Sequence, residues 1–246
     1  MNKLKVLSYN IHKGFTIRNK IFVLEKMKQA IKALDPDIVF LQEVLGDHSH
    51  DKHKIDEWHN NVQFEYLADQ LFPHHAYGKN AVYSEGHHGN AILSKYPIIS
   101  WDNINISTNN LEKRGVLHAV IDYQGKNVHA LCLHLNLLES GRRIQVKKIC
   151  ERIDSHIPSS DPVIIAGDFN DWKNKITSTF QEKLHMQEAY LTLHGKHAKT
   201  FPSSMPMLRL DRIYYRLINI QDAIHLKGEP WNTLSDHIAL FAVFEI

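Results

Sequence analysis

Residues 162–170 constrain the fold of this chain more than any other segment. Residues 162–165 (PVII) are an apolar, β-branched run, and residues 166–170 (AGDFN) follow directly. This order predicts a buried strand that presents the carboxylate of Asp168 and the carboxamide of Asn170 where it ends. The pair suits a reaction in which water is deprotonated beside an anionic oxygen that is held in place. Asp and Asn are also common in turns, so this segment alone leaves a simple Asx turn open.

The rest of the chain is organised as one unit of alternating strands and helices. Its 246 residues are 43% hydrophobic, which is enough for a sizeable core. No Pro/Gly/Ser-rich stretch, single-sign charge block or low-complexity tract interrupts the pattern, so no linker is indicated. We therefore expect a single domain over residues 1–246.

Charge and targeting signals exclude several classes of protein. The net charge of +2 is well short of the basic excess of a protein that coats DNA, so any contact with a polyanion must be local. The N-terminus enters a strand pattern without an apolar segment long enough for a signal peptide or a membrane span, and a cytoplasmic location is the default expectation. Cys132 and Cys150 are the only cysteines, and we expect free buried thiols.

Hydrophobic periodicity predicts the order of the elements. Helical patterns occupy residues 21–34, 64–71, 140–157 and 177–184, and strand patterns occupy residues 5–11, 38–42, 76–83, 90–94, 98–106, 116–123, 128–135, 162–165, 208–217 and 237–244. The first strand, helix and second strand form a crossover unit, which places strand ends along one rim of a sheet. Asn10 and Glu43, each near the end of its strand pattern, are therefore expected to be neighbours.

Polar residues of the types used in catalysis recur at or near the ends of these strands. They are Asn10, Glu43, His134, Asp168, Asn170, Asp211, Asp236 and His237. Each has a structural alternative: Asn10 in a turn, Glu43 as a solvated strand end, and Asp211 paired with a neighbouring arginine. Random placement would not so regularly put Asn, Glu, His and Asp at the ends of apolar strands, and the set as a whole indicates an active site.

Several short segments carry a family resemblance. Residues 7–11 (LSYNI), 41–43 (LQE), 89–94 (GNAILS), 167–170 (GDFN), 210–213 (LDRI) and 235–237 (SDH), together with the strand that ends near His134, resemble in order the signature blocks of the endonuclease/exonuclease/phosphatase (DNase I-like) superfamily. The longer runs 9–14, 80–90 and 168–172 look like its bacterial YbhP-type branch. The blocks extend from the first strand to the last, so the resemblance covers almost the whole chain.

This resemblance implies a fold and a metal site. The fold would be an α/β (α+β) four-layer sandwich, in which two mixed β-sheets pack face to face with helices outside and the site lies at one rim. Glu43 would be the main Mg²⁺ ligand, with Asn10 beside it and Asp236 near the metal, and Mn²⁺ would be an alternative ion. Oxygen donors of this kind match the preference of a hard cation.

The resemblance also implies catalytic roles. Asp168 would orient or deprotonate the attacking water, and Asn170 would hold a phosphate oxygen. His237, oriented by Asp211, would contact the scissile phosphate and stabilise the charge of the transition state. His134 would donate a proton or a hydrogen bond at the phosphate.

Further residues are weaker candidates for contact with substrate. Asn90 belongs to one of the signature blocks, Arg114 could reach a phosphate or form a surface ion pair, and Trp172 could line the cleft or cover the core. Glu85 is a candidate partner for a catalytic histidine, with a solvated loop carboxylate as the ordinary alternative.

Together these features predict a Mg²⁺-dependent phosphodiester hydrolase, with nucleic acid favoured as substrate over phospholipid or a small phosphoester. A non-catalytic binding module on the same fold is the weaker alternative, because such a protein would be expected to lose residues of the set. The loops at residues 47–54 and 196–201 mix Lys and His and show no apolar run of the kind that inserts into membranes. We expect a monomer with no obligate protein partner.

Overall fold

The computed structural model describes residues 2–16, 21–48, 62–83, 86–110 and 112–246. It contains two six-stranded β-sheets, in the orders β11-β12-β1-β2-β4-β3 and β5-β6-β7-β8-β10-β9. The strands of the first sheet are β1 (Lys3–Asn10), β2 (Ile38–His48), β3 (His74–Tyr83), β4 (Gly86–Ser94), β11 (Asn219–His225) and β12 (Leu240–Glu245). Those of the second sheet are β5 (Ile98–Asn105), β6 (Gly115–Tyr123), β7 (Lys126–His134), β8 (Val163–Asp168), β9 (Gln187–Glu188) and β10 (Asp211–Arg216).

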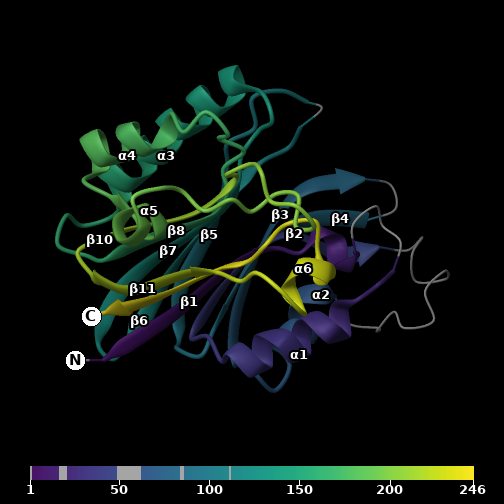
Figure 1. Ribbon diagram of the computed structural model, residues 1–246. Coiled ribbons are helices and arrows are strands. Elements are labelled where there is room, and N and C mark those ends of the chain that lie inside the picture. Colours follow the sequence, from purple (N-terminus) through teal and green to yellow (C-terminus); the bar gives the residue numbers. More distant parts are fainter. Residues whose placement is uncertain (1, 17–20, 49–61, 84–85, 111) are drawn as a thin grey trace.

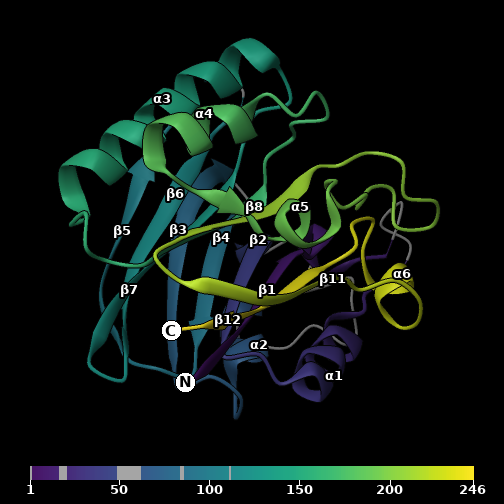
Figure 2. The same ribbon diagram turned by 60° about the vertical axis from the view of Figure 1, so that its left-hand side comes forward.

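Both sheets are mixed. In the first, β1 is parallel to β2 and antiparallel to β12, so the first and last strands of the chain are neighbours. In the second, β7 is parallel to β8, while β10 is antiparallel to β8. Figures 1 and 2 show the two chain ends at the same end of the paired sheets.

Helices cover the outer faces of the sheets. In Figures 1 and 2, α1, α2 and α6 lie on one side of the paired sheets and α3 and α4 on the opposite side. The helices are α1 (Leu24–Leu34), α2 (Gln63–Ala68), α3 (Glu139–His156), α4 (Ile176–Leu184), α5 (Ala189–His194) and α6 (Trp231–Leu234), and a short 3-10 helix, η1 (His12–Gly14), follows β1. The α/β four-layer sandwich expected from the sequence is confirmed.

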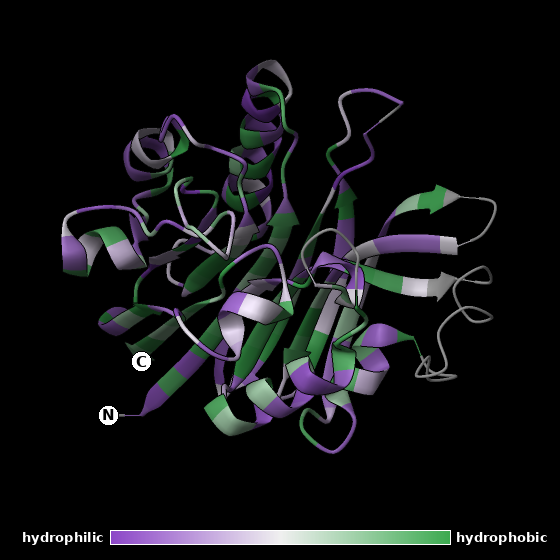
Figure 3. Cartoon of the chain, turned by 45° about the vertical axis from the view of Figure 1, so that its right-hand side comes forward, coloured by the Kyte–Doolittle hydropathy of each residue, from purple (hydrophilic) through white to green (hydrophobic). Residues whose placement is uncertain are grey.

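Three apolar clusters hold these layers together. One lies between the sheets and joins residues such as Phe40, Ile92 and Ile164, whereas the other two lie beneath the helices on either side. In α1 the buried side chains are Leu24, Met27, Ala30 and Ile31, which is the spacing of one helical face. Hydrophobic residues accordingly concentrate in the strands, and hydrophilic residues in the outer helices and loops (Figure 3).

Most element predictions hold within a few residues, but one strand end was wrong and four elements were missed. The second strand does not end at Glu43, because β2 continues to His48. The strands β9 and β11 and the helices α5 and α6 were not predicted from the sequence. β11 is an edge strand whose side chains are mostly exposed, so it lacks the apolar run on which the prediction relied.

Two predictions about cysteine and membranes can be compared with the structure. Cys132 and Cys150 are both buried and free, as expected. Among the helices of the described residues, none is both long and apolar enough to cross a bilayer.

Candidate active site

The strand register of the second sheet brings three predicted site residues to one level. His134 is the last residue of β7 and Asp168 the last of β8, and they are register partners. Asp211, the first residue of β10, is the partner of Asp168 on its other side. Gly167 permits this close approach, because its φ is +149° and a Cβ there would lie 1.9 Å from the carbonyl oxygen of Leu133.

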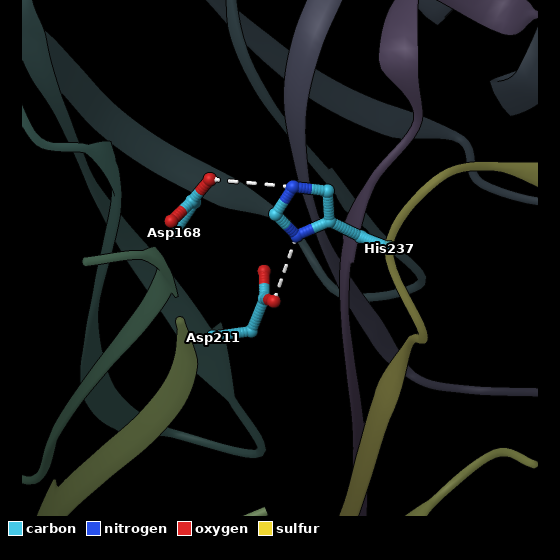
Figure 4. A group of neighbouring side chains, drawn as sticks. All are labelled: Asp168, Asp211 and His237. Carbon is cyan, nitrogen blue, oxygen red and sulfur yellow. Dashed lines mark hydrogen bonds and ion pairs between the residues drawn. The ribbon is translucent and has the colours of Figure 1, made fainter. Parts of the chain in front are cut away.

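His237 connects the two carboxylates of this sheet. Its Nδ1 lies 2.9 Å from Asp211 Oδ2, and its Nε2 lies 3.7 Å from Asp168 Oδ2 (Figure 4). All three side chains are buried, and candidate ligand atoms of the three lie within 4.8 Å of one another. The hydrogen bond that His237 Nδ1 donates to Asp211 fixes the ring and leaves Nε2 3.7 Å from Asp168 Oδ2.

The segment that carries His237 is held from both sides. Ser235 Oγ donates to the carbonyl oxygen of Asn10 at 2.7 Å and accepts from the backbone N–H of His237 at 3.2 Å. The ring of Phe201 packs against the imidazole at 4.9 Å between centroids. The loop at residues 196–201, which the sequence indicated as a candidate substrate loop, therefore packs directly against His237.

Glu43 enters the site from a β-bulge rather than from a strand end. Leu41 pairs with Ala91 and Val44 with Gly89, so Gln42 and Glu43 together oppose Asn90. Glu43 has a φ of +56°, in the left-handed region that non-glycine residues seldom adopt. A bulge re-aims side chains in this way, and such strain commonly occurs at functional sites.

Asn10 bridges the two sheets through its side chain. Its Nδ2 donates to Glu43 Oε1 at 3.2 Å and to Asp168 Oδ2 at 3.3 Å, and its Oδ1 accepts the backbone N–H of His12 at 3.1 Å. The expected proximity of Asn10 and Glu43 is confirmed. In this arrangement the Asn10 amide holds two carboxylates side by side.

His134 completes the inner wall of the site. Its Nε2 lies 3.4 Å from Asp168 Oδ2 and its Nδ1 lies 3.9 Å from Glu43 Oε1. Burial, followed by the nearby positive charge of Arg114, holds the pKa of His134 well below its ordinary value. The ring is therefore neutral at physiological pH, which suits a hydrogen-bond donor better than an acid.

The pKa values of Asp168 and His237 are both shifted in ways that matter for proton transfer. Burial raises the pKa of Asp168, with Asp211 and Glu43 adding to the rise and His237 opposing it. Burial acts to lower the pKa of His237, but Asp211 and Asp168 outweigh it and the pKa rises to about 10. A carboxylate with a raised pKa beside a protonated imidazole is a suitable pair for accepting a proton and stabilising negative charge.

Asn170 is fixed by its neighbours. Its backbone N–H donates to Asp168 Oδ1 at 2.9 Å, its Nδ2 donates to the carbonyl oxygen of Leu135 at 3.0 Å, and its φ is +50°. The side chain is buried next to Asp168, as the sequence predicted for strand-end neighbours.

Asp236 lies beside a residue that the sequence analysis missed. Asp236 Oδ2 is 3.4 Å from His12 Nδ1, and the same nitrogen is 3.9 Å from Glu43 Oε2. His12 was not among the site residues expected from the sequence. Its position two residues after Asn10, in the segment that follows a strand end, is the signal that could have identified it.

A cleft of about 430 Å³ opens onto Glu43 and His134. Its lining includes the basic side chains Lys13, His88, Lys113 and Arg114. Arg114 Nη2 also pairs with Glu112 Oε1 at 2.8 Å, so the ion pair raised as one alternative for Arg114 is found, in a side chain that also lines the cleft.

The remaining candidates make other contacts. Asn90 is buried between the sheets, where its Nδ2 donates to the carbonyl oxygens of Gly115 and Cys132. The Trp172 ring covers the guanidinium of Arg142 at 4.7 Å, and Trp172 is not among the residues that line the cleft at Glu43. Glu85 lies outside the described residues.

The donor set of this site fits a divalent cation. Glu43, Asp168 and Asp211 influence one another electrostatically, and Asp236 faces Glu43 across His12. Such a concentration of carboxylates, partly buried and only partly neutralised by histidine, is stabilised by a positive ion. Both ring nitrogens of His237 already face carboxylates, whereas the carboxylates of Glu43 and Asp236 are partly open to an entering ion.

Comparison with known proteins agrees with the fold. The Endonuclease/Exonuclease/phosphatase family profile matches residues 7–237. The uncharacterized protein YbhP of Escherichia coli (strain K12) is 42% identical over 240 residues, which cover 97% of this chain and 94% of YbhP. An endonuclease/exonuclease/phosphatase from Beutenbergia cavernae has a similar structure, with a TM-score of 0.79 and 18% identity over 100% of this chain and 72% of that one. D. rerio TDP2, in complex with a single-strand DNA product, superposes with a TM-score of 0.76 and 17% identity over 100% of both chains.

These matches place the chain in a class of proteins that share this fold. The chain belongs to the endonuclease/exonuclease/phosphatase family. Members of this family are typically phosphoester hydrolases and generally depend on a divalent metal.

Proposed function

We propose that this chain is a Mg²⁺-dependent phosphodiesterase that cleaves nucleic acid. The observation that carries the proposal is the meeting of two groups at one rim: the carboxylates of Glu43 and Asp236, and the buried chain Asp168, His237 and Asp211. The first group suits a hard cation, and the second suits proton transfer and charge stabilisation. Because all these residues come from one chain, we also propose that it works as a monomer, without an obligate protein partner.

Each residue then has a role in hydrolysis of a P–O bond. Asp168 accepts the proton of the attacking water, and Asn170 and Asn10 hold that carboxylate and its neighbours in place. The Nε2–H of His237 donates to a phosphate oxygen, since its 3.7 Å separation from Asp168 leaves it available. The bound cation would polarise the phosphoryl oxygen and stabilise the charge on the leaving oxygen.

Nucleic acid is favoured by charge. The cleft at Glu43 has Lys13, Lys113 and Arg114 in its lining, and repeated phosphates would meet these cations. The structural likeness to TDP2, which was solved with a single-strand DNA product, also supports this substrate class. The two free buried cysteines fit a protein that works in the reducing cytoplasm.

A phospholipid substrate is the second candidate, and one observation favours it. Leu137, Leu138 and Trp172 are 56%, 69% and 40% exposed, and all three follow strands that end at the site. Arg142 links them, because its Nη1 donates to the carbonyl oxygen of Leu137 and its guanidinium covers Trp172. Exposed apolar side chains grouped in this way can rest on a membrane surface.

A turnover panel tests the proposed function. We expect the protein to hydrolyse DNA or RNA with Mg²⁺ or Mn²⁺, to be inactive in excess chelator, and not to be restored by Ca²⁺ alone. The panel should also include phospholipid vesicles and sugar phosphates. Full activity in chelator would refute the metal dependence. Turnover with vesicles alone, lost in Leu138→Glu, would move the assignment to phospholipid.

Salt dependence gives a second prediction. Lys196 and Lys199 are exposed on the loop whose Thr200 and Phe201 contact the His237 segment, so a strand of nucleic acid at the rim would meet them. Binding of an oligonucleotide should weaken steeply as salt rises from about 50 to 200 mM. Replacing both lysines by Ala should reduce the slope of log K against log salt concentration by about one to two units. Cleavage of a small phosphodiester should not change.

The matched control uses two lysines at the opposite end of the strands. Lys3 and Lys126 are exposed where β1 and β7 begin, whereas the site lies where these strands end. The Lys3→Ala/Lys126→Ala protein should keep the slope of the unmodified protein. An equal loss of slope in both double variants would show that the rim lysines have no special role.

A further inference from the structure

His12 occupies a position between the two carboxylates assigned to the metal. Its Nδ1 lies 3.4 Å from Asp236 Oδ2 and 3.9 Å from Glu43 Oε2. In an octahedral site with bonds of about 2.1 Å, neighbouring ligand atoms are about 3.0 Å apart and opposite ones about 4.2 Å. The two separations from His12 Nδ1 fall between these limits. One cation touching all three atoms would also require the Glu43 and Asp236 side chains to rotate toward each other.

The imidazole of His12 is directed at the two carboxylates through Nδ1. The turn after β1 does not need the ring, because the backbone N–H of His12 donates to Asn10 Oδ1. Within the described residues, its buried Nε2 has no hydrogen-bond partner. The ring therefore serves neither the turn nor a second hydrogen bond, and its contacts with polar groups are those at Asp236 and Glu43.

The site remains open enough for an ion to enter. The side chains of His12, Glu43 and Asp236 are about one fifth exposed, at 20%, 21% and 18%. His12 and Glu43 also both adopt left-handed backbone, with φ of +45° and +56°. The chain therefore keeps two strained residues in the conformations that direct these side chains toward each other.

We propose that His12 is a nitrogen ligand of the catalytic cation, beside the oxygens of Glu43 and Asp236. This inference rests on the proposed function and specifies its metal site. Oxygen-only sites suit Mg²⁺, whereas imidazole increases the affinity for first-row transition metals. The site is thus a mixed nitrogen and oxygen site that binds Mn²⁺ more tightly than Mg²⁺.

Mn²⁺ alone is the probe for the test. In the metal-free full-length protein, electron paramagnetic resonance measures the Mn²⁺ that stays free during a titration, and its pulsed form detects a directly bound ¹⁴N nucleus. We expect nitrogen modulation in the unmodified protein. In His12→Ala the modulation should disappear, and the Kd for Mn²⁺ should rise by about tenfold or more. His12→Asp should retain binding without nitrogen modulation, and should shift the preference toward Mg²⁺ in competition titrations.

Two controls make the outcome decisive. His156→Ala removes an exposed histidine at the end of α3 and should change neither affinity nor modulation. A thermal melt shows that each variant is folded, and if His12→Ala is not, His12→Asp carries the test. Modulation that survives both His12 substitutions, or that disappears only in His134→Gln, would overturn the inference. Hydrolysis with Mn²⁺ in the absence of nitrogen modulation would leave the proposed function intact, whereas absence of any metal-dependent hydrolysis would refute the function itself.

Discussion

Replacement of Asp168 by Asn should lower turnover by about 10²- to 10⁴-fold while the protein stays folded. Asn has nearly the same shape but cannot accept the proton of the attacking water. Its side-chain oxygen can still accept the backbone N–H of Asn170, which Asp168 Oδ1 accepts at 2.9 Å. The measurement is kcat on a small phosphodiester with saturating Mg²⁺, together with a thermal melt.

Stability should change with pH in a direction set by burial. Burial raises the pKa of Asp168, so its ionised form is disfavoured in the folded protein relative to the unfolded chain, where the pKa is about 3.9. Ionisation of Asp168 therefore destabilises the unmodified protein as the pH rises from the pKa of this residue in the unfolded chain through its pKa in the folded protein. The Asn variant has no such group and does not lose stability in this way. We therefore compare the difference in Tm, variant minus unmodified protein, at two pH values. This difference should be larger for Asp168→Asn at pH 8 than at pH 4.

A surface substitution provides the control for this prediction. Asp222 is exposed on β11, and Asp222→Asn should change neither turnover nor the relative Tm. If Asp168→Asn turned over at the rate of the unmodified protein, Asp168 would not be the base.

The positions of the strand-end residues could be predicted because they depend on simple rules. An apolar run followed by Gly-Asp-x-Asn places Asp168 at the end of β8, and a crossover between parallel strands places Asn10 near Glu43. The register that aligns His134, Asp168 and Asp211 is a consequence of three neighbouring strands with apolar interiors. Such features are local, or follow from sheet geometry.

What could not be predicted depends on backbone conformation and on distant contacts. The bulge that directs Glu43 into the site is invisible to periodicity, because strand β2 is apolar on both sides of it. The left-handed backbone of His12 and Glu43 is adopted by residues that do not prefer it. Packing of Phe201 on His237 joins segments that no local pattern relates. The residues that sequence analysis missed or misplaced thus lie where tertiary structure overrides local preference.

Asp211→Asn should reduce turnover by a factor approaching that of Asp168→Asn, because it acts on both the orientation and the charge of His237. Asp211 Oδ2 lies 2.9 Å from Nδ1, and both side chains are buried. An amide can offer its N–H₂ to that nitrogen and so favour the wrong tautomer, and in a serine protease triad the equivalent change costs about 10⁴-fold. The measurement is the pH profile of kcat for both proteins.

The direction of the pH effect follows from the causes of the His237 shift. Burial acts to lower its pKa, and Asp211 and Asp168 together raise it to about 10. Without the Asp211 charge the pKa must fall, so the alkaline loss of activity should begin at a lower pH in the variant. Stability from this histidine is fully present below its unfolded pKa of about 6.5 and is lost as pH rises through about 10 in the unmodified protein. In Asp211→Asn, the free energy of unfolding should therefore fall less between pH 6 and pH 10 than it does in the unmodified protein. An unchanged kcat profile, or a melt showing that the variant is unfolded at pH 7, would contradict the assignment of Asp211 as the residue that positions and charges His237.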